Sequence, residues 1–376
     1  MIIINLAQIF FIILFGFIIT IICAKKFSLT LQRTIILFIW HTFFSFVYAW
    51  YVSKFGGDAN YYYNSSQDEN NLFGYSTKFI VFITSFLHDF ANLSFISMNI
   101  LFGIFGAIGL FAFDSSLRFV TKDANKKVKL LATIIVFLPS ASFWSSGLGK
   151  DSISFMAINL ILWACFNLRK HKWIFVIGIT SLFLVRPHIA IILLFSFTAT
   201  LILNDKLKIF NRIALFLIFL IIGLSVLDMG LEIVGFTKDL TFNNVIAFIE
   251  NRQNYNWEGW RGGIDIRDMS LPTKLFTYLF RPLPFEAHSF TAFFASLENI
   301  FLLYLFVLGL IAKLNNKGVV ANPDLNTLFF LIYIITTLLL FSNMTANLGI
   351  AVRQKWMFLP FLIVMFISYI VKRKNK

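Results

Sequence analysis

Long apolar segments alternate with short polar stretches along the whole chain. Most of these segments contain few charged residues and approach the length that a helix needs to cross a bilayer. The pattern predicts about eleven membrane-spanning helices, over residues 2–23, 34–52, 93–113, 130–146, 153–168, 173–185, 189–203, 213–228, 291–312, 326–342 and 356–371. We therefore expect a single all-α, polytopic integral membrane domain over residues 1–376.

Composition agrees with this class of protein. Hydrophobic residues make up 59% of the chain and charged residues only 13%, against about 25% charged residues in soluble domains. The formal charge of +14 is expected to orient the helices in the membrane rather than to bind nucleic acid. The chain has no P-loop, no dinucleotide fingerprint and no zinc-ligand spacing, so we expect no nucleotide cofactor and no zinc site.

The basic residues are distributed unequally between alternate loops. One set of loops and the C-terminal tail hold 20 of the 32 Lys and Arg residues but only 4 of the 18 acidic residues. The positive-inside rule makes this set cytoplasmic. The N-terminus is then outside, the C-terminus is inside, and the two longest outer loops cover residues 53–92 and 228–289.

Several cations lie on the predicted outer face, at or near helix ends. They are Lys150, which is followed by Asp151, and Arg186, Arg281, Arg353 and Lys355. Arginine binds phosphate through a bidentate fork and lysine adds a point charge, so together these residues suit an anionic head group. Each could also have a simpler role, because Lys150 and Asp151 could pair at a turn and the others could anchor the helices at the interface.

Acids and aromatic residues accompany these cations. Asp58 follows two glycines and precedes Tyr61, and it could deprotonate an acceptor hydroxyl, with His188 as the competing base. The aromatic ring of Tyr61 is suited to stacking on sugars. Glu286 lies just past Arg281, and a divalent metal stays open only if the fold brings Asp58 and Glu286 together. The remaining candidates for sugar binding are Trp257, Trp260 and Arg261 in the long outer loop.

The chain resembles the Wzy-type O-antigen or capsule repeat-unit polymerases and, more distantly, the GT-C-like membrane glycosyltransferases. The resemblance lies in size, in the Phe- and Ile-rich helices, and in the stretches "GGDANYYY", "PSASFWSSGLGKDS", "RPH", "FRPLPFEAHSF" and "RQKW". It implies an enzyme of the bacterial inner membrane that joins repeat units carried on undecaprenyl diphosphate. Arg186, Arg281 and Arg353 would hold the diphosphate, and membrane lipid and a chain-length regulator protein are the other partners implied.

Three other functions remain open on the sequence. A GT-C enzyme would add a single sugar from a polyprenyl-phosphate donor. A ligase would move finished polysaccharide to its final acceptor. A flippase or transporter would need polar groups along the whole pathway, whereas the ionisable groups of the predicted helices cluster near the outer end.

Overall fold

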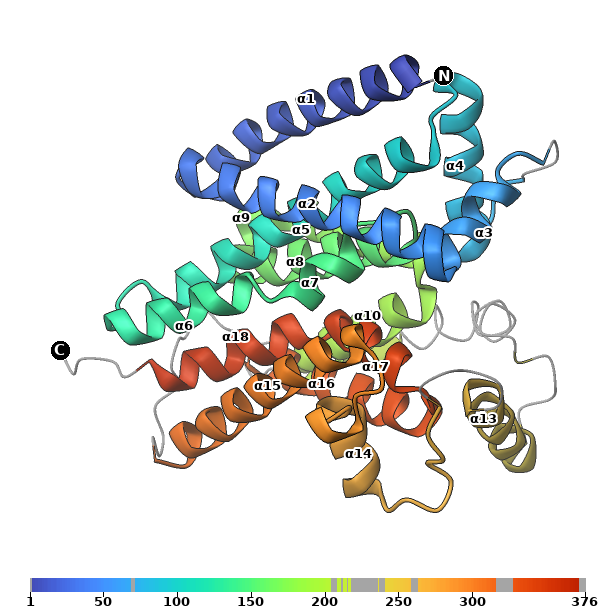
Figure 1. The fold of residues 1–376 in the computed structure, drawn as a ribbon. Coiled ribbons are helices and arrows are strands. Elements are labelled where there is room, and N and C mark those ends of the chain that lie inside the picture. Colours follow the sequence, from blue (N-terminus) through green and yellow to red (C-terminus); the bar gives the residue numbers. More distant parts are fainter. Residues whose placement is uncertain are drawn as a thin grey trace. The chain divides into compact units, whose positions relative to one another are not determined.

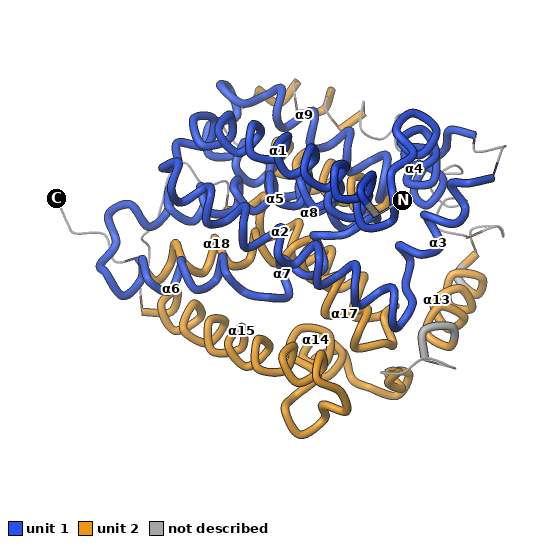
Figure 2. Tube along the Cα trace, turned by 45° about the horizontal axis from the view of Figure 1, so that its top comes forward, with its two compact units in different colours: residues 1–187, 321–325, 371–376 blue, residues 188–320, 326–370 orange. Residues whose placement is uncertain are grey.

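A computed structural model describes residues 2–68, 72–203, 208–210, 212–214, 216–217, 236, 241–257, 263–315 and 327–371. Most of these residues are helical, and the one β contact among them is an isolated bridge between Gly263 and Asn347. The chain divides into two compact units, which follow one another at Pro187 and His188 (Figure 2). The prediction of an all-α fold is confirmed for the described part of the chain.

The first unit is built around α5 (Phe95–Thr121), which is buried along most of its length. Helix α5 packs against α1, α2, α6, α7 and α8, and α8 packs against α9 (Figure 1). The other helices are α1 (Ile2–Lys26), α2 (Leu31–Phe55), α3 (Asp58–Ser65), α4 (Thr77–Ala91), α6 (Lys126–Val136), α7 (Pro139–Ser145), α8 (Lys150–Ala164), the 3-10 turn η1 (Cys165–Asn167) and α9 (Leu168–Val185).

In the second unit, α15 packs against α18 (Figure 1). Helix α16 packs against α13, α14 and α18. Its helices are α10 (Pro187–Ile202, whose first residue belongs to the first unit), α13 (Phe242–Trp257), α14 (Leu271–Phe280), η2 (Pro284–Glu286), α15 (Phe290–Asn315), α16 (Thr327–Met344), α17 (Leu348–Gln354), η3 (Lys355–Met357) and α18 (Leu359–Ile370).

The described residues contain seven segments long and apolar enough to cross a membrane, or eight if the bent pair of α17–η3 and α18 forms one span. One of the seven, residues 150–185, is folded in the structure as α8 and α9 lying side by side, since a Cβ on Gly178 would contact Ile161. The membrane character of the chain is supported, while the count of about eleven spans stays a prediction. Most of the helix expected over 213–228 lies outside the described residues.

The structure differs from the sequence interpretation at three places. The expected outer loop 53–92 contains two helices, α3 and α4. The helix expected over 130–146 is divided into α6 and α7, because Pro139 cannot donate a backbone hydrogen bond and instead begins a new helix. The long loop expected over 228–289 contains α13 and α14.

Most basic residues of the first unit gather at one end of its helices, which we call the basic end. Helix α1 finishes with Lys25 and Lys26 there, and Arg118 lies in the last turn of α5. The ends of these helices are joined by the Ser115 hydroxyl, which donates to the Phe27 carbonyl at 2.7 Å and accepts from the Trp163 indole at 3.0 Å. These cations of α1 and α5 therefore lie at one end of the unit, and the direction in which the basic end faces stays a prediction.

Close backbone contact fixes α7 against α5. A Cβ at Gly106 would lie 2.0 Å from the Ser145 carbonyl oxygen and 2.5 Å from Nε2 of His41. His41 is fully buried, and the same ring nitrogen lies 3.4 Å from that carbonyl. Only a residue without a side chain leaves room for α7 to end there and for the following turn to reach α8.

We expect Gly106→Ala to lower the free energy of unfolding by roughly 1–3 kcal/mol, because the added methyl group must displace backbone. The thermal midpoint of the purified protein in detergent measures this effect. Gly349→Ala in α17 is the matched control, since its Cβ would approach only the Asn347 side-chain oxygen, at 3.2 Å. Equal midpoints for Gly106→Ala and the wild type would contradict this account of α7.

Candidate functional site

The turn between α7 and α8 lies at the end of the first unit opposite the basic end. Its backbone is held by Asn99 of α5, whose side-chain oxygen accepts from the Leu148 N–H at 2.9 Å. Gly149 has φ +155°, which L side chains rarely adopt, and the Tyr62 ring of α3 lies 3.3 Å from where its Cβ would be. The turn is thus fixed from both sides, and α8 begins immediately after it.

Lys150, the first residue of α8, contacts the start of α4. Its Nζ lies 3.1 Å from the hydroxyl oxygen of Thr77 and 3.5 Å from that of Ser76. Ser76 has φ +60°, and its N–H donates to the Leu184 carbonyl of α9 at 2.7 Å. The start of α4 is therefore fixed between the first residue of α8 and the last turn of α9.

Asp151, the next residue of α8, forms an ion pair with Arg186 at the end of α9. The Arg186 side chain is only 7% exposed, and the Asp151 side chain 19%. The Nε atom of Arg186 is buried without a hydrogen-bond partner among the described residues. Ser76, Thr77, Lys150, Asp151 and Arg186 form what we call the α8 cluster, with two cations and one anion.

Such a cluster suits an anionic ligand. A buried arginine that is only partly satisfied gains from a phosphate oxygen, because charge-assisted hydrogen bonds are stronger where water is excluded. The excess of one positive charge in the α8 cluster favours an anion over a cation. The N–H groups of the first turn of α8 add to this preference.

Helix α3 brings Asp58 and Tyr61 to the same end of the unit. It begins at Asp58, after Gly56 with φ +81° and Gly57 with φ +156°. Asp58 is one turn before Tyr62, on the same face of the helix as the ring that contacts Gly149. Asp58 is exposed, and Tyr61 is 58% exposed. A carboxylate and an accessible aromatic ring thus lie on the helix that adjoins the turn before Lys150.

In the second unit, Arg281 and Glu286 form a two-contact ion pair. Nε of Arg281 donates to one carboxylate oxygen at 3.1 Å, and a terminal nitrogen lies 2.5 Å from the other. Glu286 also accepts the Leu283 N–H at 2.8 Å. Desolvation acts to raise the pKa of Glu286, but these hydrogen bonds and the charges of Arg281 and His288 outweigh it and lower the pKa. Glu286 is therefore ionised and compensates the charge of Arg281.

Lys355 lies in the interior of the second unit and is only 1% exposed. Its Nζ donates to the Asn299 side-chain oxygen, lies 3.5 Å from the Leu279 carbonyl, and interacts electrostatically with Glu298. Asn299 in turn donates to the Pro282 carbonyl at 3.1 Å. Lys355 and Asn299 therefore contact the backbone on both sides of Arg281.

The remaining candidates have fewer described contacts. His188, in the first turn of α10, is half-buried, with its ring 6.4 Å from that of Phe341. Arg353 is half-buried near the end of α17. Trp257 is the last residue of α13, and its side chain is not among those described. Trp260 and Arg261 lie outside the described residues.

The structure thus brings together Lys150, Asp151 and Arg186, and separately Arg281 and Glu286. Convergence of both groups on one ligand stays a prediction. Sequence reasoning missed Ser76, Thr77, Asn99 and Asn299, although Ser–Thr immediately before an apolar run is a recognisable signal for a helix start. Among the described residues, no three His, Cys, Asp or Glu side chains are grouped to hold a metal ion.

Comparisons with known proteins do not add to this description. Neither protein-family models nor curated proteins nor solved structures give a significant match to the chain. The functional assignment therefore depends on the residues and their geometry. What these establish together is a helical protein with long apolar helices typical of membrane proteins, and a polar cluster at one end of its first unit.

Proposed function

We propose that this chain is a membrane glycosyltransferase that polymerises oligosaccharide repeat units carried on undecaprenyl diphosphate, at the outer face of the bacterial inner membrane. The α8 cluster carries this proposal. It is a partly buried group, with Arg186 the buried member, that has net positive charge at the end of apolar helices and lies opposite the basic end. A lipid-linked diphosphate has its charge at the junction of head group and acyl chain, where the ends of membrane-spanning helices are expected.

The α8 cluster would stabilise the leaving group. When a glycosyl group is transferred, the bond between the anomeric carbon and the phosphate oxygen breaks, and the diphosphate leaves with the electron pair. Arg186 would donate to the phosphate from its buried position, and Lys150 would add a second charge beside the Thr77 hydroxyl. Donors fixed in advance stabilise developing charge without the cost of reorganising water.

Asp58 would act on the acceptor. The acceptor hydroxyl oxygen bonds to the anomeric carbon as the diphosphate departs, and its proton passes to the Asp58 carboxylate. Tyr61, on the same helix and exposed, would stack on an acceptor sugar. His188 remains the competing base, because it follows Arg186 by two residues along the chain.

The second unit holds further candidates for contact with an anionic head group. Arg281 would supply a further donor, with Glu286 holding its guanidinium in a fixed direction. Arg353 would be the third arginine of the set. The ammonium group of Lys355 is enclosed, so Lys355 would act by holding the backbone on either side of Arg281 in place.

Deleting the gene in its host and examining the surface glycan tests the proposal. A polymerase predicts that the ladder of long chains disappears, while single repeat units on the carrier lipid remain and reach the outer leaflet. Long chains stranded on the carrier would indicate a ligase instead, and a shortened repeat unit a single-sugar transferase. Repeat units confined to the inner leaflet would indicate a flippase. Each of these last three results would overturn the assignment as polymerase.

Lys150→Gln is expected to lower polymer synthesis by about 10- to 100-fold, because it removes one hydrogen bond to a charged group. Chain-length ladders from the deletion strain carrying each variant measure the effect. Lys172→Gln, an exposed lysine at the start of α9 near the basic end, is the matched control and should be active. A normal ladder from Lys150→Gln at the wild-type protein level would exclude Lys150 from phosphate binding.

A further inference from the structure

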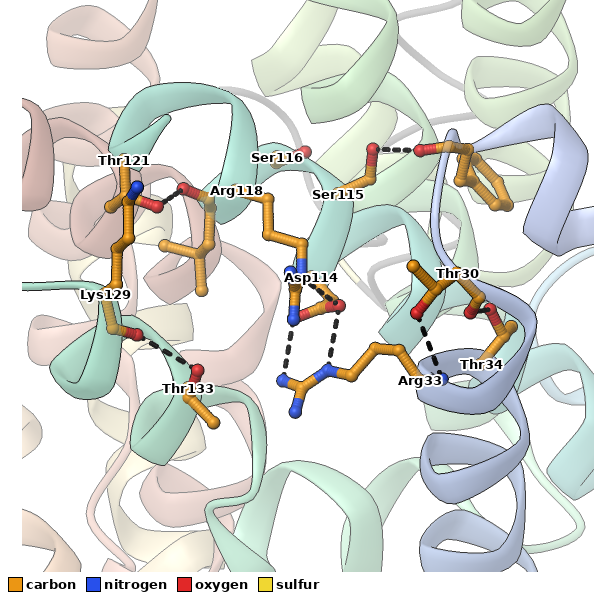
Figure 3. Close-up of polar contacts among 12 residues, drawn as sticks. Thr30, Arg33, Thr34, Asp114, Ser115, Ser116, Arg118, Thr121, Lys129 and Thr133 are labelled. Atoms are coloured by element: carbon orange, nitrogen blue, oxygen red, sulfur yellow. Dashed lines mark hydrogen bonds and ion pairs between the residues drawn. The ribbon is translucent and has the colours of Figure 1, made fainter. Parts of the chain in front are cut away.

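A second cationic cluster lies near the basic end of the first unit, far along α5 from the α8 cluster. Asp114 of α5 accepts two hydrogen bonds from Arg33 of α2, at 3.0 and 3.2 Å, and one from Nε of Arg118 at 3.0 Å (Figure 3). The Asp114 side chain is 3% exposed. Arg33, Asp114 and Arg118 form what we call the α5 triad, in which one carboxylate serves two guanidinium groups.

The guanidinium group of Arg118 is only partly engaged in the α5 triad. Arg33 donates one hydrogen bond to each carboxylate oxygen of Asp114. Its Cζ atom also lies 4.8 Å from the centre of the Phe137 ring. Arg118 contacts the carboxylate through Nε alone, and its side chain is 51% exposed. Its terminal nitrogens make no hydrogen bond within the described residues. The triad therefore carries one excess positive charge, at an accessible group that can bind an oxyanion in a bidentate manner.

A second cation lies beside this guanidinium group. Lys122 is four residues after Arg118 and therefore on the same face of the α5 terminus, and it is exposed. Its Nζ lies over the Phe119 ring at 5.7 Å. Arg118 and Lys122 can thus bracket one phosphate group, while Asp114 holds Arg118 from behind.

Exposed aliphatic side chains lie on the helices that carry or adjoin the α5 triad. On α2, Ile36 is 46% exposed, one turn after Arg33. On α6, Leu130 is 61% and Ile134 45% exposed, four residues apart along one face. Charged nitrogens next to exposed aliphatic side chains match a molecule that has a phosphate at one end and acyl chains at the other. A soluble anion would gain nothing from these aliphatic residues.

We propose that the α5 triad and Lys122 form a binding site for the phosphodiester head group of an anionic phospholipid, in the leaflet that the basic end faces. Basic pockets between membrane helices bind such head groups. The site is separate from the α8 cluster and takes no part in substrate binding. A lipid bound there would hold α2 and α5 together through Arg33, Asp114 and Arg118.

Lipid retention by the full-length protein tests this proposal. The protein is purified in a zwitterionic detergent, and bound phosphatidylglycerol or phosphatidylcholine is counted by non-denaturing mass spectrometry. We expect preferential retention of phosphatidylglycerol, and about fivefold weaker retention by Arg118→Gln, since one cation near a membrane surface contributes about this factor. Lys127→Gln removes an exposed charge of the same end outside the triad and is expected to retain the lipid like the wild type.

Two further arms distinguish a lipid site from a diffuse charge effect and from a site for a free anion. Arg118→Lys keeps the charge without the bidentate fork, so we expect retention between those of the wild type and Arg118→Gln. Inorganic phosphate at millimolar concentration is expected not to displace the lipid. Equal losses for Arg118→Gln and Lys127→Gln would show only a diffuse charge effect and overturn the proposal. Displacement by inorganic phosphate would also overturn it, in favour of a site for a free anion.

Discussion

Replacing Arg186 with glutamine is expected to reduce polymer synthesis by about 100- to 1000-fold, the usual cost of losing one fixed donor to a developing negative charge. Arg186 has the least exposed side chain in the α8 cluster, at 7%, and water cannot readily replace its guanidinium. Glutamine keeps hydrogen-bonding capacity but not the charge. Synthesis of long chains in a deletion strain, normalised to protein level, measures the loss.

Two variants separate catalysis from stability in this experiment. Arg169→Gln changes an exposed arginine at the opposite end of the same helix, α9, and is expected to leave synthesis unchanged. The double variant Arg186→Gln/Asp151→Asn removes the carboxylate that the single variant leaves without its partner. We expect it to restore protein level but not synthesis. Restored synthesis in the double variant would show that Arg186 only stabilises the fold.

Much of the fold could be predicted because an apolar segment long enough to span a bilayer has few alternatives to a helix. The helices α1, α2, α5, α15 and α16 correspond to segments predicted from hydrophobicity. Helices α3 and α4 were not predicted, because α3 is short and polar and α4, at 15 residues, is too short to span a bilayer. Hydrophobicity identifies residues that avoid water, and it does not distinguish a short amphipathic helix from a polar connection.

Helix ends limited the prediction of charged contacts. The sequence interpretation ends one helix at residue 113 and so places Asp114 in a loop, whereas α5 continues to Thr121. This places Asp114 two turns inside the helix, where it requires the cations of Arg33 and Arg118. A helix boundary drawn from hydrophobicity stops at the first charged residue, although that charge can be compensated by a neighbouring helix.

The candidate site was predictable in its residue types but not in its pairings. Lys150 and Asp151 are neighbours, so a local pair at the turn was one interpretation. In the structure Asp151 forms an ion pair with Arg186, 35 residues further along, because α8 and α9 are antiparallel neighbours. Which cation meets which anion is decided by helix packing, and this information is spread over many apolar positions.

Lys355→Met is expected to lower the free energy of unfolding by about 3–5 kcal/mol, the usual cost of leaving a buried charge without its compensating charge. The change leaves the Glu298 carboxylate, which is 8% exposed, without the nearby ammonium charge, and it leaves Asn299 without its donor. Methionine has a similar length and fills the same space. Thermal unfolding of the purified protein in detergent measures the loss.

A neutralising second change distinguishes charge from packing at this position. Glu298→Gln/Lys355→Met removes both charges, so we expect it to recover a large part of the stability lost in Lys355→Met. Lys313→Met, at the exposed end of α15, is the matched control and is expected to unfold like the wild type. A double variant no more stable than Lys355→Met would mean that the hydrogen bonds of Lys355 to Asn299 and Leu279, rather than its charge, hold the segment that carries Arg281.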